Sequence, residues 1–219
     1  SDTLNNIFYK EEYYSELTFH YWYWKNLLKI SDNSWVGFCQ KRRFWIKSSS
    51  SKDIISKENI KEHLLVEPEN DWNKYQSIIC KPISVAGAKR LKILKRGWRS
   101  VIKKPSILFN EEKQNIKLHF DMHHGYGNLE RAIDLLDVED KSDFNNYVIN
   151  NSIFNPHIMF IAKKDILNKW FSKLFPWLEK CENQFGFDNL KGYDTKRLYA
   201  YLAERYLSFW FKKYTVYKE

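Results

Sequence analysis

The sequence has few cysteines and no long apolar run. Its three cysteines, Cys39, Cys80 and Cys181, are far apart, and none belongs to a C-x-x-C pair. Neither a disulfide framework nor a zinc site is therefore indicated, and a reducing cytoplasm is the compartment that fits best. No apolar run approaches the roughly 20 residues that cross a bilayer, and no signal peptide opens the chain. Any contact with a membrane is expected to be peripheral.

The sequence also lacks internal repeats, domain-dividing linkers and the signatures of common nucleic-acid modules. We find no helix-turn-helix, zinc-finger, RRM or KH pattern, so nucleic acid is not a favoured partner. The 219 residues, of which 43% are hydrophobic, are enough for a sizeable core. We therefore expect one domain over residues 1–219.

Positive charge and aromatic rings are abundant. The formal net charge is +9, and aromatic residues make up 17% of the chain, with nine tryptophans. The charge favours acidic partners, namely nucleic acid, anionic lipid headgroups or nucleotide-linked substrates, but does not choose among them. The rings either line a cleft or contact surface, or simply fill the core.

Apolar spacing and turn residues predict alternating helices and strands, which indicates an α/β fold. Strands are predicted within residues 35–47, 76–81, 115–120 and 157–162, and helices over residues 11–29 and 57–65. Later helices are expected to start at caps, which are Asn128, Ser142, Asp165 and Asp194. Pro176 is expected to kink or interrupt the helix that follows Asp165. Residues 31–34 and 48–53 are predicted to be a turn and a surface loop. On the first helix, Glu16 and His20 fall outside the apolar stripe and are expected to face solvent.

The stretch over residues 35–47, WVGFCQKRRFWIK, joins a predicted buried strand to three cations. Lys41, Arg42 and Arg43 follow directly after the apolar run. Ligands of α/β sheets bind at the carboxyl ends of strands, and paired arginines suit a phosphate or diphosphate. The alternative is a solvated basic turn that closes a hairpin, and this stretch alone does not decide between them.

Two further segments are candidates for function. Asp121, His123 and His124 lie beside glycines in a predicted loop, as catalytic residues often do. A third ligand at metal spacing is not visible, and such histidines more often pack or bind backbone.

Residues 88–104 are strongly basic, with apolar residues interleaved. A helix broken at Gly97 would suit a membrane surface or a nucleic-acid face, and the alternative is a surface helix with solvated lysines.

Several motifs resemble those of one family. The pattern Y-x-E-L-T-x-x-Y-W-x-W-K-N fits residues 14–26, an R-R-F motif fits residues 42–44, and His157 precedes an M-F-I strand. Arg197 and the pair Glu204-Arg205 match the closing helix. The sequence resembles a family of bacterial capsular, exopolysaccharide and lipopolysaccharide glycosyltransferases, catalogued as domain of unknown function 4422, from about residue 6 to the last helix.

This resemblance implies a GT-A-like α/β fold, with a Rossmann-like sheet flanked by helices and without its first strand. It implies a hexosyltransferase-like enzyme that moves a sugar from a nucleotide diphosphate donor to a glycan or lipid-linked glycan acceptor. The enzyme would work in the cytoplasm, with a peripheral contact at the inner face of the membrane. Gln40-Lys41 and Asn128-Leu129 depart from the family pattern, so donor or acceptor preference could differ.

The sequence contains no Asp-x-Asp, the motif with which many GT-A enzymes hold a metal. We therefore expect no divalent metal or other cofactor, and expect Lys41, Arg42 and Arg43 to bind the donor diphosphate. The candidates for the base are Asp121 first, then His123, His124 and Glu16. The expected substrate-binding residues are Trp24, Asn155, His157, Glu204 and Arg205. The alternative function is a non-catalytic basic and aromatic module that binds nucleic acid or glycan.

Overall fold

The computed structural model describes residues 2–30 and 34–219, so residues 31–33 of the predicted turn lie outside the described ranges. The helices are α1 (Glu11–Tyr14), α2 (Leu17–Asn26), α3 (Ile60–His63), α4 (Arg90–Arg96), α5 (Trp98–Lys103), α6 (Ile116–His124), α7 (Asn128–Ile133), α8 (Val138–Asn150), α9 (Lys164–Phe185), α10 (Tyr193–Lys196) and α11 (Leu198–Tyr214). The strands are β1 (Trp35–Phe38), β2 (Ser77–Ile79), β3 (Ile83–Ser84), β4 (Ile153–Phe154), β5 (Phe160–Lys163) and β6 (Tyr217–Lys218). The 3-10 helices in the described ranges are η1 (Phe8–Lys10), η2 (Ser48–Ser50), η3 (Asn70–Lys74), η4 (Pro105–Leu108) and η5 (Glu111–Lys113).

The central sheet has four strands in the order β1-β5-β2-β6. β5 runs antiparallel to both of its neighbours, and β2 and β6 are parallel. The α/β class is therefore confirmed. The prediction that the first strand is buried is wrong, because β1 pairs on one side only and Phe38 is its one buried residue.

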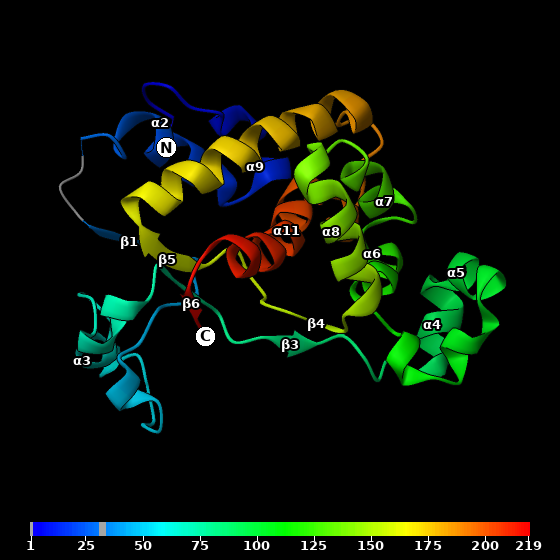
Figure 1. Ribbon diagram of the computed structural model, residues 1–219, viewed down its shortest axis with the longest axis horizontal. Helices are drawn as coiled ribbons and strands as arrows, with labels where there is room; N and C mark the ends of the chain where they lie inside the picture. The colour runs from blue at the N-terminus through cyan, green and yellow to red at the C-terminus, as the bar shows by residue number, and fades with distance from the viewer. Residues whose placement is uncertain (1, 31–33) are drawn as a thin grey trace.

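Helices cover one face of the sheet, and an irregular segment covers the other. α2, α9 and α11 lie on the first face, where Phe38 and Phe160 join the main core with Trp170 (Figure 1). Residues 44–75 cover the second face, where Trp72 packs with Ile78 and Ile161. α6, α7 and α8 extend the main core away from the sheet, and α4 and α5 form a lobe beyond them (Figure 1).

The helix predicted over residues 11–29 is broken at Ser15. Ser15 has φ 51° and ψ −132°, a conformation that ends α1 and lets α2 start in a new direction. His20 on α2 is buried rather than solvent-exposed, so that prediction is wrong. Its ring packs against Phe38 at 4.2 Å between centroids, and burial lowers the pKa of His20 to about 3.

Residues 115–120, predicted as a strand, belong to helix α6. The apolar residues at every second position suggested a strand, but α6 lies between two apolar clusters. Ile116 and Phe120 face the main core, whereas Leu118 and Met122 face a second cluster with Ile93. Each pair is four residues apart, which is one side of a helix. The Asn115 side chain caps α6 by accepting a hydrogen bond from the Leu118 N–H at 2.9 Å.

Some predicted helix boundaries also differ from the structure. α8 begins at Val138, so Ser142 lies inside it, and Asp165 lies in the first turn of α9. α9 continues past Pro176 to Phe185. Asp194 lies in the short helix α10 rather than at the start of α11. The break at Gly97 is confirmed, because α4 ends there and α5 begins.

None of the helices in the described ranges is long and apolar enough to cross a membrane.

Candidate active site

A pocket of about 290 Å³ lies where four segments meet beside the sheet. These segments are the break between α1 and α2, the turn after β1, the turn between β4 and β5, and the stretch from α10 into α11. Its charged and polar lining includes Glu16, Arg43, His157, Arg197, Tyr201 and Glu204. The pocket therefore combines two carboxylates, two guanidinium groups and an imidazole from distant parts of the sequence.

A tight turn after β1 brings Arg43 to the pocket. The backbone N–H of Arg43 donates to the Gln40 carbonyl at 3.1 Å, and the Gln40 N–H donates back at 3.2 Å. The Arg43 guanidinium also donates to the Gln40 side chain at 3.2 Å. Lys41 and Arg42 lie at the exposed tip of this turn and do not line the pocket. The structure thus brings one of the three predicted cations to the pocket wall.

Glu204 connects the pocket to the turn between β4 and β5. Its carboxylate accepts a hydrogen bond from the backbone N–H of His157 at 2.5 Å and forms an ion pair with Arg205. His157 has φ 68°, a conformation that costs energy for a residue other than glycine. Strained backbone of this kind occurs twice in the pocket lining, at His157 and at Ser15, and such strain clusters at functional sites.

Arg205 lies behind the pocket and does not line it. Its side chain is 2% exposed, and its guanidinium carbon lies 3.8 Å from the centre of the Phe154 ring. Its second nitrogen donates to His119 Nδ1 at 3.3 Å. The ion pair with this buried guanidinium holds the Glu204 carboxylate in place for His157.

Asn155 is fully buried and fixes the same turn from below. Its N–H donates to Ser208 Oγ at 2.8 Å, and its side-chain amide donates to the Cys80 carbonyl at 2.6 Å and to Glu219 at 3.0 Å. These bonds tie the turn to α11 and to the end of β2. The structure therefore gives Asn155 a positioning role two residues before His157.

The charges around His157 set its protonation. Burial lowers the pKa of His157 and the Arg43 charge lowers it further, while Glu204 and Glu16 act in the opposite direction. The net lowering leaves the imidazole neutral at pH 7, when it can donate or accept a hydrogen bond. Glu16 differs from Glu204, because no side chain in the described ranges donates a hydrogen bond to its carboxylate.

Asp121 lies on α6, outside this pocket, and its carboxylate is hydrogen-bonded to neighbouring residues. Its carboxylate accepts hydrogen bonds from the Gly127 N–H at 3.0 Å and from Lys117 Nζ at 3.1 Å. Burial raises the pKa of Asp121, and Lys117 and the Gly127 N–H partly offset this. Its contacts connect α6 to the start of α7, away from the pocket lining.

Of the two histidines at the end of α6, His124 contacts a residue of the pocket lining. The His124 ring stacks on Tyr201 at 3.8 Å between centroids, and its Nδ1 donates to the Asp194 carbonyl at 2.7 Å. Burial lowers the pKa of His124 to about 3. His123 Nδ1 accepts a hydrogen bond from Arg96 at 2.9 Å. Neither histidine lines the pocket, and the packing seen at His124 is the ordinary alternative for such a residue.

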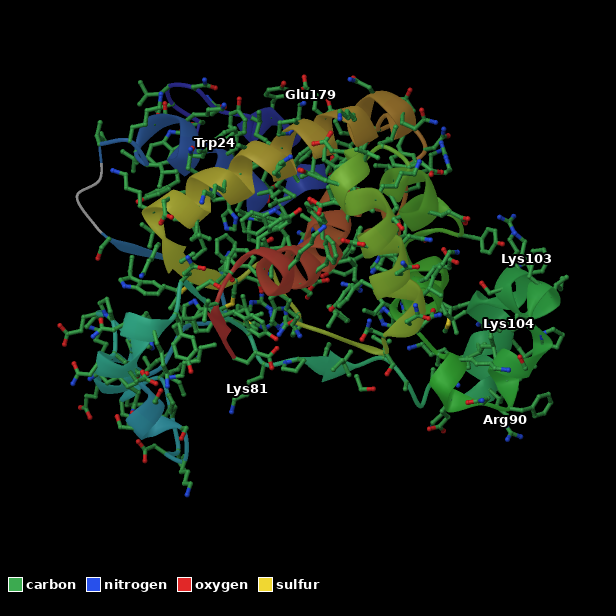
Figure 2. The ribbon with its side chains drawn as sticks, in the orientation of Figure 1. Trp24, Lys81, Arg90, Lys103, Lys104 and Glu179 are labelled. Atoms are coloured by element: carbon green, nitrogen blue, oxygen red, sulfur yellow. The ribbon has the colours of Figure 1, made fainter. Side chains whose placement is uncertain are left out.

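Trp24 is also outside the pocket. Its indole N–H donates to Asn168 at 3.1 Å, and its ring stacks on Phe175 at 5.6 Å between centroids. Both partners belong to α9, and Figure 2 shows Trp24 beside that helix. The side chain therefore attaches α2 to α9.

The sequence reasoning did not name Arg197 and Tyr201 as site residues. Arg197, at the start of α11, lies four residues before Tyr201, and Tyr201 lies three residues before Glu204. The three side chains therefore lie on one side of this helix. That spacing is the signal that could have identified them once Glu204 was chosen.

Within the described residues, no group of three or more His, Cys, Asp and Glu side chains could hold a metal ion.

The chain is similar to a family of proteins and to a solved structure. A family model described as Domain of unknown function (DUF4422) matches residues 1–215, so the chain belongs to that family. A comparison with curated proteins gave no match. Among solved structures, the chain is similar to an apo structure of the bifunctional glycosyltransferase WbbM, with a TM-score of 0.68 and 21% sequence identity. The alignment covers 97% of this chain and 35% of the WbbM chain, and it shows a shared fold.

Proposed function

We propose that this chain is a glycosyltransferase with a GT-A-like fold, and that the pocket at Glu16 and Arg43 is its active site. It would move a sugar from a nucleotide diphosphate donor to a glycan or lipid-linked glycan acceptor in the synthesis of a surface polysaccharide. The fold shared with WbbM and the motifs of the family support this proposal. The observation that carries it is the meeting of guanidinium groups and carboxylates in one pocket, on turns with strained backbone.

In this proposal, arginines of the protein neutralise the donor diphosphate. Arg43 and Arg197 line the pocket, and each planar guanidinium can donate two parallel hydrogen bonds to phosphate oxygens. Lys41 and Arg42, at the tip of the same turn, add to the positive field. In this proposal, protein cations take the place of a metal ion and stabilise the charge that develops on the leaving diphosphate.

The Glu16 carboxylate is the base that we propose. A base must reach the proton that it removes, and Glu16 lines the pocket, whereas Asp121 is engaged by Lys117 and Gly127 outside it. Glu204 is held by the His157 N–H and by Arg205. The acceptor oxygen attacks the anomeric carbon and passes its proton to Glu16. The bond from that carbon to the diphosphate oxygen breaks, and its electron pair leaves with the diphosphate.

Two substitutions test these roles separately. Thermal-shift measurements with UDP-, GDP- and CMP-sugars first identify the donor, and single-stranded DNA is included as a competing ligand. Arg43→Ala should weaken donor binding and lower kcat/KM about tenfold or more, as loss of a charged hydrogen bond does. Glu16→Gln should keep donor binding and lower kcat by about 10²–10⁴-fold. Arg131→Ala, an exposed arginine of α7 outside the pocket, is the matched control and should change neither.

Two results would contradict the proposal. Transfer that survives Arg43→Ala but stops when a chelator is added would show that a metal, not the protein, carries the diphosphate charge. Stabilisation by single-stranded DNA and by no nucleotide sugar would instead support a non-catalytic binding module.

A further inference from the structure

The lobe formed by α4, α5 and η4 carries almost the whole net charge of the chain. Residues 88–109 contain eight Lys and Arg residues and no Asp or Glu, while the formal net charge of the 219 residues is +9. The rest of the chain is therefore close to neutral. The lobe lies at one end of the molecule, away from the sheet, and Figure 2 shows Arg90, Lys103 and Lys104 on it (Figures 1 and 2).

The inner side of the lobe packs against α6. Ile93 is fully buried among Leu118 and Met122, and Val101 joins this cluster. Gly97 allows the close approach, because a Cβ atom there would lie 3.0 Å from Met122 Cγ and 3.0 Å from the Ile93 carbonyl oxygen. These contacts bury one apolar stripe of the lobe. One such stripe is enough to attach a surface helix to a core.

The outer side of the lobe carries a second apolar stripe that is exposed. Leu91 is 81% exposed, Trp98 52% and Ile102 69%, with Leu94 at 45% between them. Leu91 and Leu94 are three residues apart on α4, and Trp98 and Ile102 are four residues apart on α5, so each pair lies on one side of its own helix. Phe109, 75% exposed, follows η4. Cations flank the stripe, and no described element covers it.

We propose that this outer face docks the protein onto an anionic lipid surface. The apolar side chains would enter the boundary between headgroups and acyl chains, while the flanking lysines and arginines bind lipid phosphates. The aliphatic side chains favour lipid over nucleic acid, because single strands bind aromatic rings by stacking, which leaves Leu91 and Ile102 in water. This inference goes beyond the proposed function and does not depend on it.

Docking at this face would also orient the active-site pocket. Arg96, on the lobe, forms an ion pair with Asp194 of α10 at 3.1 Å. The neighbouring residue, Tyr193, lines the pocket. A lobe attached to the membrane surface would therefore hold the pocket close to lipid, where a lipid-linked acceptor would be found.

Vesicle co-sedimentation of the full chain tests the proposal. We expect binding to vesicles of phosphatidylcholine with phosphatidylglycerol, weaker binding at high salt, and little binding to phosphatidylcholine alone. Replacing Lys103 and Lys104 together by Ala should weaken binding about fivefold for each removed charge. Trp98→Ala combined with Ile102→Ser should weaken binding about tenfold or more, and both residues are exposed, so the fold should be kept.

Matched controls come from exposed residues outside the lobe. Val138→Ser removes an apolar side chain that is 92% exposed, and Lys52→Ala with Lys57→Ala removes two exposed charges. Neither control should change vesicle binding. The proposal fails if the wild type does not bind anionic vesicles, if the lobe variants bind as well as the controls, or if single-stranded DNA is bound in place of vesicles. The assay needs no sugar donor, so its failure would leave the proposed transfer reaction untouched.

Discussion

At the scale of single residues, one buried guanidinium supports the wall of the pocket. Arg205 pairs with Glu204, and Glu204 accepts the His157 N–H at 2.5 Å. On its other side Arg205 donates to His119 at 3.3 Å. Adjacent residues on a helix do not normally face each other, so the Glu204–Arg205 pair is maintained by these surroundings. The position of His157 in the pocket thus depends on a residue that does not line the pocket.

Replacing Arg205 by Met tests this dependence. The change keeps an apolar side chain over Phe154 but leaves the largely buried Glu204 carboxylate without its partner. Breaking a buried ion pair from one side costs about 3–5 kcal/mol, so the free energy of unfolding should fall by that amount in urea denaturation. Lys180→Met breaks an exposed pair with Asp137 and should cost about 0–1 kcal/mol. Equal losses in the two variants would contradict the role of Arg205.

The motifs of the sequence identified several residues that the structure gathers into one pocket. Glu16, Arg43, His157 and Glu204 were all named from the sequence, although they lie on four segments. Asp121 was named with them and lies elsewhere. Its assignment assumed that residues 121–128 are a loop, whereas Asp121 belongs to α6 and faces Lys117. Motifs therefore marked the positions, but only the packing shows which side chains share a cavity.

At the scale of secondary structure, the sequence misled where a helix has two apolar sides. α6 alternates apolar and polar residues because it packs on the main core and on the α4–α5 lobe at once. Periodicity alone does not distinguish this arrangement from a strand. Strong single-stripe helices such as α9 were predicted, and a helix broken at Gly97 was one of the interpretations of residues 88–104.

The break between α1 and α2 is an element boundary with measurable strain. Ser15 has φ 51° and ψ −132°, a region that glycine adopts far more readily than other residues. Ser15→Gly should therefore raise the free energy of unfolding by about 0.5–1 kcal/mol, after the entropy that glycine adds to the unfolded chain is subtracted. Ser15→Ala keeps the strain and is the matched control. A Gly variant no more stable than the Ala variant in thermal unfolding would contradict this.

At the scale of the whole molecule, buried and half-buried histidines that stay neutral occur on two different helices. His20 lies between α2 and the sheet, while His119 and His124 lie on α6. The pKa of each is lowered to about 3, mainly by burial, and the Arg205 charge contributes to this lowering for His119 and His124. A pKa near 3 means that these side chains stay neutral in the folded protein at mildly acidic pH.

Stability should consequently decrease in mild acid. A histidine in the unfolded chain takes up a proton as the pH falls through about 6.5, whereas the folded ones do so only near pH 3. The unfolded state therefore binds more protons than the folded state between these two pH values, which favours unfolding. Each buried histidine then removes up to about 1.4 kcal/mol of unfolding free energy per pH unit below 6.5. Urea denaturation between pH 7 and pH 4.5 measures this slope. His20→Phe removes one of these proton-binding groups, so the slope should be smaller by the part that one proton contributes. The change loses no hydrogen bond, because His20 Nδ1 has no partner in the described residues. An unchanged slope would show that His20 is not neutral in the fold.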